Sequence, residues 1–133
     1  MKKLLKTIGL ALGVAVALSM AEIERAATKY TPKGSEPTII EGLSAADTQL
    51  IPNRNGNVII RVTNGAEAIN ATIVTPNDVG GNAVADVVNA IGANKVEIMG
   101  PFDPAIYNNA KGQLELKFDK VVGVKLEIIE VDF

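Results

Sequence analysis

The side chains that could perform chemistry in this chain are carboxylates, because its 133 residues include no histidine and no cysteine. An imidazole base, a thiol nucleophile and a zinc–thiolate site are therefore excluded. Asp78 and Asp86 flank Gly80 and Gly81, and carboxylate oxygens are ligands that suit Ca²⁺. Their spacing matches no calcium loop, and Asp beside Gly is common in ordinary turns. The glycines also lack the lysine of a phosphate-binding loop. We expect neither a metal ion nor a cofactor here.

A second set of charged side chains alternates with apolar residues near the end of the chain. The set consists of Glu115, Lys117, Lys125, Glu127 and Glu130. Alternation with a period of two is typical of a strand with one solvent-facing side, so we expect these charges on the solvent face. No motif pairs two carboxylates for glycoside hydrolysis. We therefore predict that the protein is not an enzyme and has no catalytic residue.

Residues 100–108 form a predicted crossover between two strands, 95–99 and 113–118. Pro101 and Pro104 cannot both lie inside a paired strand, because proline has no N–H to donate. An aspartate followed by a proline is typical of the start of a helix. A helical turn is therefore predicted over residues 103–108.

The crossover is the first candidate contact surface. Its predicted partner-contact residues are Phe102, Asp103, Ile106 and Tyr107. The alternative is that the two aromatic rings close the end of the domain's own core. Tyr107 is the one we expect to be more exposed, because its hydroxyl favours a wet or hydrogen-bonded position.

The amino-terminal segment is the second candidate contact surface. Lys2, Lys3 and Lys6 precede an uncharged stretch over residues 7–21, which ends in a small-x-small sequence typical of signal-peptide cleavage at Ala21. As a helix the stretch would be about 22 Å long, shorter than the roughly 30 Å bilayer core.

Four interpretations of this segment stay open: a cleaved signal peptide, a membrane anchor, a retained helix that docks on a neighbour or on lipid, and a pilin-like leader. Residues 22–27 still favour helix, so a retained helix would reach residue 28. Its partner-contact residues would be Leu10, Leu12, Val14, Val16 and Leu18. A membrane or lipid contact through residues 2–28 belongs to the same hypothesis.

Prolines and a glycine mark residues 29–37 as a linker between this helix (1–28) and a β domain (38–133). The net charge is −2, but it is distributed unevenly: the amino-terminal region is basic and the body is acidic. An acidic body without a basic stripe argues against nucleic acid as a partner.

The body reads as about eight short strands separated by turn residues. They are predicted over residues 38–41, 48–51, 57–63, 68–75, 84–88, 95–99, 113–118 and 124–131. This spacing predicts an all-β fold, an antiparallel β-sandwich or a jelly-roll-like body with an amino-terminal apolar helix. The expected core is aliphatic and comprises Val58, Ile60, Val62, Ile73, Val96, Ile98, Leu114, Leu116, Phe118, Leu126, Ile128 and Val131.

A resemblance rests on two motifs: the Asn-Gly turns that bracket residues 55–65, and Gly-Pro-Phe-Asp-Pro at 100–104 with Tyr107 and Asn108. A strand starting at Gly112 and a closing valine-rich strand follow. Over about residues 45–133 the chain resembles small β-sandwich structural proteins of tailed phages, of the capsid decoration or head-associated minor type.

The resemblance implies a non-enzymatic virion protein that binds the major capsid protein or a neighbouring structural subunit, stabilises the particle and forms homo-oligomers. Two alternatives from other classes remain. One is an exported binding module, secreted or at the cell surface. The other is an extracellular filament subunit held by its amino-terminal helix.

Overall fold

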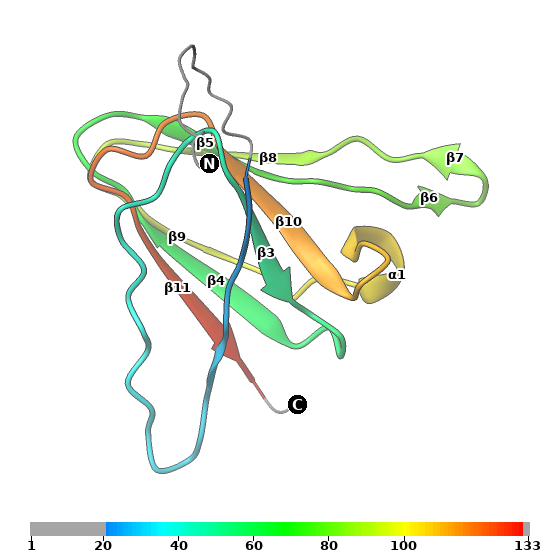
Figure 1. The fold of residues 1–133 in the computed structure, drawn as a ribbon, viewed down its shortest axis with the longest axis horizontal. Coiled ribbons are helices and arrows are strands. Elements are labelled where there is room, and N and C mark those ends of the chain that lie inside the picture. Colours follow the sequence, from blue (N-terminus) through cyan, green and yellow to red (C-terminus); the bar gives the residue numbers. More distant parts are fainter. Residues whose placement is uncertain (1–20, 132–133) are drawn as a thin grey trace, which may run out of the picture.

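The computed structural model describes residues 21–131, and the predicted all-β character is confirmed (Figure 1). The first sheet has the order β1-β3-β10-β5-β8 and the second the order β2-β11-β4-β9. The first sheet comprises β1 (Glu22–Glu24), β3 (Thr48–Pro52), β10 (Gln113–Phe118), β5 (Ile69–Ile73) and β8 (Val87–Ile91). The second comprises β2 (Thr28–Lys29), β11 (Lys125–Glu130), β4 (Val58–Thr63) and β9 (Val96–Met99).

The remaining elements are short. β6 (Asp78–Val79) and β7 (Asn82–Ala83) form a hairpin, and α1 (Pro104–Tyr107) is a single helical turn. No helix within residues 21–131 has the length and apolar character needed to cross a membrane.

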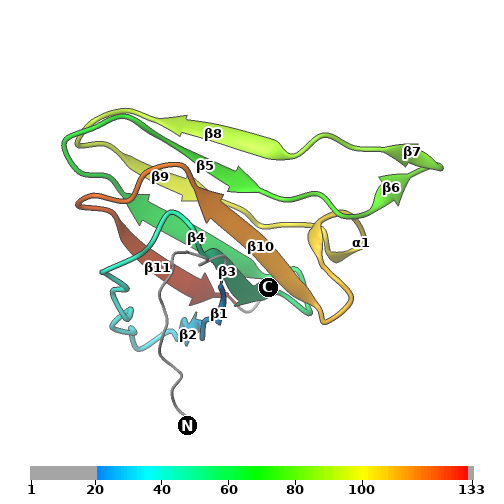
Figure 2. The same ribbon diagram turned by 45° about the horizontal axis from the view of Figure 1, so that its top comes forward.

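One aliphatic core lies between the two sheets, which form two layers in Figure 2. β4 contributes every second residue to it, Val58, Ile60 and Val62, each at most 1% exposed. The facing strand β10 contributes Leu114 and Leu116 in the same way. Each such side chain contributes about 1.5–3 kcal/mol by leaving water. Alternation therefore identified most of the core correctly.

Three predicted core residues are wrong. Val96 and Ile98 in β9 are 44% and 67% exposed, and Val131 is only half-buried. Met99 is 6% exposed and occupies the inner face, and side chains two apart along a strand share a face. Once Met99 packs inward, Ile98 and Val96 must point outward on alternate positions.

The helix predicted to reach residue 28 is contradicted by β1 and β2, which are extended. β1 pairs in parallel with β3 and β2 pairs in parallel with β11, so the sheets are mixed rather than purely antiparallel. Helix propensity is worth only tenths of a kcal/mol per residue, whereas the edges of β3 and β11 offer a row of backbone hydrogen bonds. Residues 1–20 of the predicted helix lie outside the described residues.

This amino-terminal stretch crosses from the first sheet to the second, so the predicted boundary at residues 29–37 does not separate it from the body. Glu22 aligns with Thr48 in one sheet, and Thr28 aligns with Ile129 in the other. Of the strand predicted at 38–41, only Ile40 pairs, in a single bridge with Leu126.

A two-stranded arm extends the β5 and β8 strands beyond the first sheet and ends in the β6–β7 hairpin (Figures 1 and 2). The strand predicted at 84–88 begins only at Val87 and runs to Ile91. Residues 76–82, between the predicted strands, contain β6 and the start of β7. Figure 1 shows the arm projecting past α1.

Candidate protein contact surface

The crossover contains the helical turn that the sequence predicts. The Asp103 side chain accepts a hydrogen bond from the Ala105 N–H at 2.9 Å, and Pro104 is the first helical residue. The turn ends where the Asn108 N–H donates to the Pro104 carbonyl at 3.2 Å. Asp103 thus satisfies one N–H that the helix itself leaves unpaired.

The two aromatic rings of the crossover pack on the end of the core. Phe102 is 7% exposed, and its ring meets that of Tyr107 edge-on at 5.6 Å between centroids. Tyr107 is half-buried, so it is the more exposed of the two, as expected. Ile106 is also half-buried, whereas Asp103 is exposed. The rings close the core, and contact of these four residues with a partner stays a prediction.

Buried asparagines hold the crossover in place, which the sequence analysis missed. Asn53 Nδ2 donates to Asn108 Oδ1 at 2.8 Å, and Asn108 Nδ2 donates back to the Asn53 carbonyl at 2.8 Å. Asn53 Nδ2 also donates to the Phe102 carbonyl at 3.1 Å. Asn53 and Asn108 are 1% and 8% exposed, so these bonds take the place of the hydrogen bonds to water that the amides lose on burial.

The same cluster anchors the arm. Asn77 Nδ2 donates to the backbone carbonyls of Asn108 and Ile106 at 2.8 and 3.2 Å. A second clamp follows, because the Thr75 N–H donates to Asp86 Oδ1 at 2.8 Å. The β3–β4 turn, the crossover and the base of the arm are therefore joined by side-chain hydrogen bonds.

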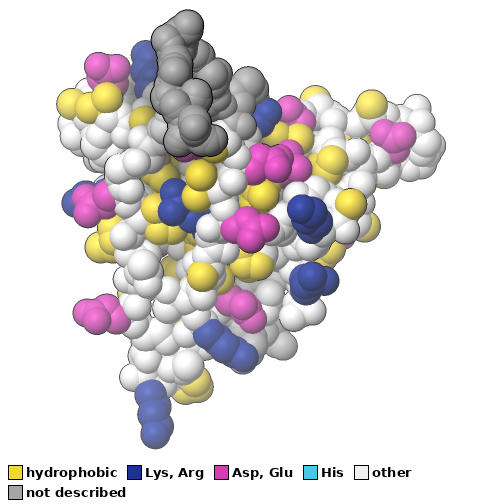
Figure 3. Space-filling model, in the orientation of Figure 1, with side chains coloured by type: hydrophobic (Ala, Val, Ile, Leu, Met, Phe, Trp, Pro, Cys, Tyr) yellow, Lys and Arg dark blue, Asp and Glu magenta, His cyan; other side chains and the backbone are white. Residues whose placement is uncertain are grey.

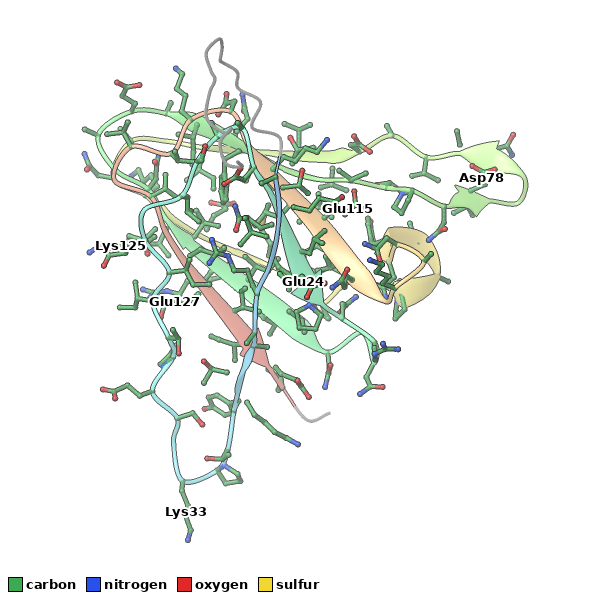
Figure 4. All side chains as sticks on the ribbon, viewed as in Figure 1. Glu24, Lys33, Asp78, Glu115, Lys125 and Glu127 are labelled. Atoms are coloured by element: carbon green, nitrogen blue, oxygen red, sulfur yellow. The ribbon has the colours of Figure 1, made fainter. Side chains whose placement is uncertain are left out.

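The candidate acidic pair is not brought together as a site. Asp86 accepts a hydrogen bond from the Thr75 backbone, whereas Asp78 lies toward the tip of the arm, paired with Ala83, three residues before Asp86 (Figure 4). Within residues 21–131, no three side chains of metal-ligating type are grouped as a metal site.

Glu127 differs from its predicted place on the solvent face. It is 8% exposed, and Arg61 Nη1 donates to its Oε1 at 2.5 Å. The β4–β11 register places these two residues directly opposite each other. Acidic and basic side chains are otherwise interspersed over the face in Figure 3. A buried charge persists because it is paired.

A small recess lies at one end of the body, lined by Pro52, Arg54, Asn55, Asn57, Val58 and Glu130. Its volume is about 140 Å³. Pockets for small molecules usually measure about 300–1,000 Å³. The recess is too small to enclose a ligand of that kind.

The strongest contact feature is the outer side of β9, which we call the open edge. β9 is the last strand of its sheet, and among residues 21–131 no strand pairs with its outer side. The Asn64 N–H donates to the Lys95 carbonyl at 2.9 Å. Residues that bond a neighbouring antiparallel strand alternate with residues whose backbone groups face away. The N–H and C=O groups of Val96 and Ile98 therefore face outward.

The edge of the other sheet lies beside the open edge. Asn89 Nδ2 in β8 donates to Met99 Sδ in β9 at 2.9 Å, which joins the two edge strands. Val88 in β8 is 59% exposed, and Val96 and Ile98 are exposed too. On the opposite side of the molecule, β1 and β2 cover the edges of β3 and β11. Apolar side chains and unpaired backbone thus coincide on the β8–β9 side.

No protein-family model, no curated protein and no solved structure matches this chain.

Proposed function

We propose that this protein is a non-enzymatic virion structural protein of the capsid decoration or minor capsid type. Its β-sandwich body binds neighbouring capsid subunits and stabilises the particle. The proposal draws on the phage-protein resemblance of the strand pattern and on one structural observation. That observation is the open edge, where unpaired backbone groups and the exposed Val96 and Ile98 lie together.

Exposed edge strands are a hazard that proteins usually block with charges, prolines or a covering segment. Lys95 precedes β9 and Glu97 lies in it, but the residues with outward backbone groups are the two aliphatic ones. An incoming strand would satisfy these groups and cover Val96 and Ile98 in one step. Strand addition of this kind is a common mode of protein recognition. A structural subunit that assembles with other subunits would use such an edge to bind them.

The test compares the native protein with two lysine variants of matched exposure. Ile98→Lys places a charge on the open edge. Val122→Lys changes a side chain that is 77% exposed in the turn between β10 and β11. We expect wild type and Val122→Lys to co-sediment with the particles of the native source, and Ile98→Lys to bind at least tenfold more weakly. Equal binding by all three variants would contradict the role of the edge. A soluble monomer that never sediments with particles would contradict the proposed function.

The exported binding module is the second candidate, and one observation favours it. The Ala21 carbonyl accepts a hydrogen bond from the Thr48 N–H at 2.9 Å, and β1 begins at Glu22. Cleavage at the predicted site after Ala21 would remove this one hydrogen bond but leave all of β1 in the mature protein. Intact mass of the native protein separates the two candidates. A chain that starts at Glu22 would favour export, and a chain that starts at residue 1 or 2 would favour a retained segment.

A further inference from the structure

The amino-terminal residues beyond the described structure have a sequence pattern that matches the open edge. Large aliphatic residues stand at every second position, with small residues between them. The large residues are Leu10, Leu12, Val14, Val16 and Leu18, and the small ones are Ala11, Gly13, Ala15 and Ala17. A period of two is the signature of a strand, whereas a helix repeats about every 3.6 residues. The adjoining β1 is itself extended rather than helical.

We propose that residues 10–18 of one copy add as a β-strand to the open edge of another copy. This inference rests on the proposed function and names the partner at its contact surface as a second copy of the chain. Val96 and Ile98 offer the backbone groups, and the large residues of the incoming strand lie on the same face as these two side chains. Its small residues then face the other way. The pairing therefore covers apolar side chains that are 44% and 67% exposed.

The strand must come from a different copy because its own chain is too short to reach. Leu18 stands three residues before Ala21, and three extended residues span roughly 10 Å. Ala21 is held beside Thr48, next to β1 at one edge of the first sheet, whereas β8 is at the other edge. Four strand spacings separate β1 from β8, which is roughly 19 Å at about 4.8 Å each. The open edge lies on the β8 side.

The assembly that follows is directional. The donating segment leaves one side of the molecule, and the accepting edge lies on the opposite side. Such a contact joins copies head to tail and gives closed rings, or open filaments when the rotation does not close. The chain contains no cysteine, so introduced cysteines can form a disulfide only with each other and can trap this contact.

The first experiment uses pairs of single-cysteine variants of the full-length protein, mixed and oxidised. Leu12→Cys, Val14→Cys and Val16→Cys are each mixed with Ile98→Cys, because a disulfide needs Cα atoms about 4.4–6.8 Å apart and the three sample adjacent registers. We expect at least one pair to form a disulfide-linked heterodimer in high yield. The control replaces Ile98→Cys with Val122→Cys. No heterodimer above the control yield in any pair would overturn the inference.

The second experiment separates this inference from the proposed function. Val14→Lys and Ile98→Lys are compared with Val122→Lys by sedimentation of the full-length protein and by binding to particles. We expect both of the first two variants to lose self-association at least tenfold. If Ile98→Lys alone loses binding to particles and Val14→Lys retains self-association, the edge serves a different partner and the inference falls while the proposed function stands. Intact mass showing a native chain that starts at Glu22 would overturn the inference as well.

Discussion

The side chains of Asn53 and Asn108 bind each other's residues in both directions, with two hydrogen bonds of 2.8 Å. One residue follows β3 and the other ends α1, so the pair joins two turns that lie 55 positions apart in the sequence. Asn77 adds the arm to the same cluster. Asparagine side-chain amides therefore hold together three loops that lie far apart in the sequence.

Asn53→Ala should destabilise the protein more than Asn108→Ala. Asn53→Ala leaves both the amide oxygen of Asn108 and the Phe102 carbonyl without these partners, because Asn53 Nδ2 donates to each. Asn108→Ala leaves Asn53 Nδ2 bonded to the Phe102 carbonyl and the Asn53 carbonyl bonded to the Gly56 N–H. Each unsatisfied buried polar group costs about 1–3 kcal/mol, so we expect a loss of about 2–4 kcal/mol for Asn53→Ala. Urea unfolding measures the difference. The exposed Asn55→Ala, expected to change stability by under about 0.5 kcal/mol, is the control; equal losses for all three would contradict the role of the pair.

Ile98 and Met99 are neighbours on opposite faces of β9, and their substitutions should separate stability from assembly. Ile98→Lys should change the free energy of unfolding by less than about 1 kcal/mol, because the side chain is 67% exposed. Met99→Ala should cost about 2–5 kcal/mol, because it leaves a cavity in the core. Thermal or urea unfolding measures both. A large loss for Ile98→Lys would mean that β9 presents its other face to the core.

Arg61 and Glu127 should respond unequally to loss of charge. Arg61→Met leaves the carboxylate of Glu127, only 10% exposed by side chain, without its partner, and we expect a loss of about 3 kcal/mol. Glu127→Gln leaves Arg61, which is 43% exposed and stays hydrated, so the loss should be about 1 kcal/mol or less. Denaturant unfolding of both single variants and of Arg61→Met with Glu127→Met measures this. If the two single variants lose the same amount, the burial of Glu127 is not what sets the cost.

Asp119 should make stability depend on pH in the acid range. The Asn70 backbone N–H donates to the Asp119 carboxylate at 2.8 Å and, with a second bond from the Asn70 side chain, holds the pKa of Asp119 below its ordinary value. A carboxyl group with a lowered folded-state pKa stabilises the fold above its unfolded-state pKa, and this stabilisation is lost as the pH falls through the folded-state value. Asp119→Asn should therefore flatten the stability profile below about pH 4. Unfolding measured between pH 2 and 6 tests it; an unchanged slope would show that other carboxylates carry the acid dependence.

Local sequence decided the parts of the fold that depend on neighbours along the chain. Alternation of apolar with polar residues placed β10 and β11, β-branched residues placed β4, and the aspartate–proline pair placed α1 with its cap. Both signals act within a few residues, because strand alternation and helix capping are properties of short stretches of backbone. The aromatic closure of the core by Phe102 and Tyr107 followed from the same stretch.

Only the tertiary structure decided which face and which partner each element has. Lys95 to Met99 contains apolar residues in both phases, and the packing of Met99 chose the phase that exposes Ile98. Residues 22–24 favour helix locally, yet pairing with β3 makes them a strand. Glu127 is buried because register places Arg61 opposite it. These outcomes depend on contacts between residues far apart in the sequence, whose free energies exceed the tenths of a kcal/mol that separate local preferences.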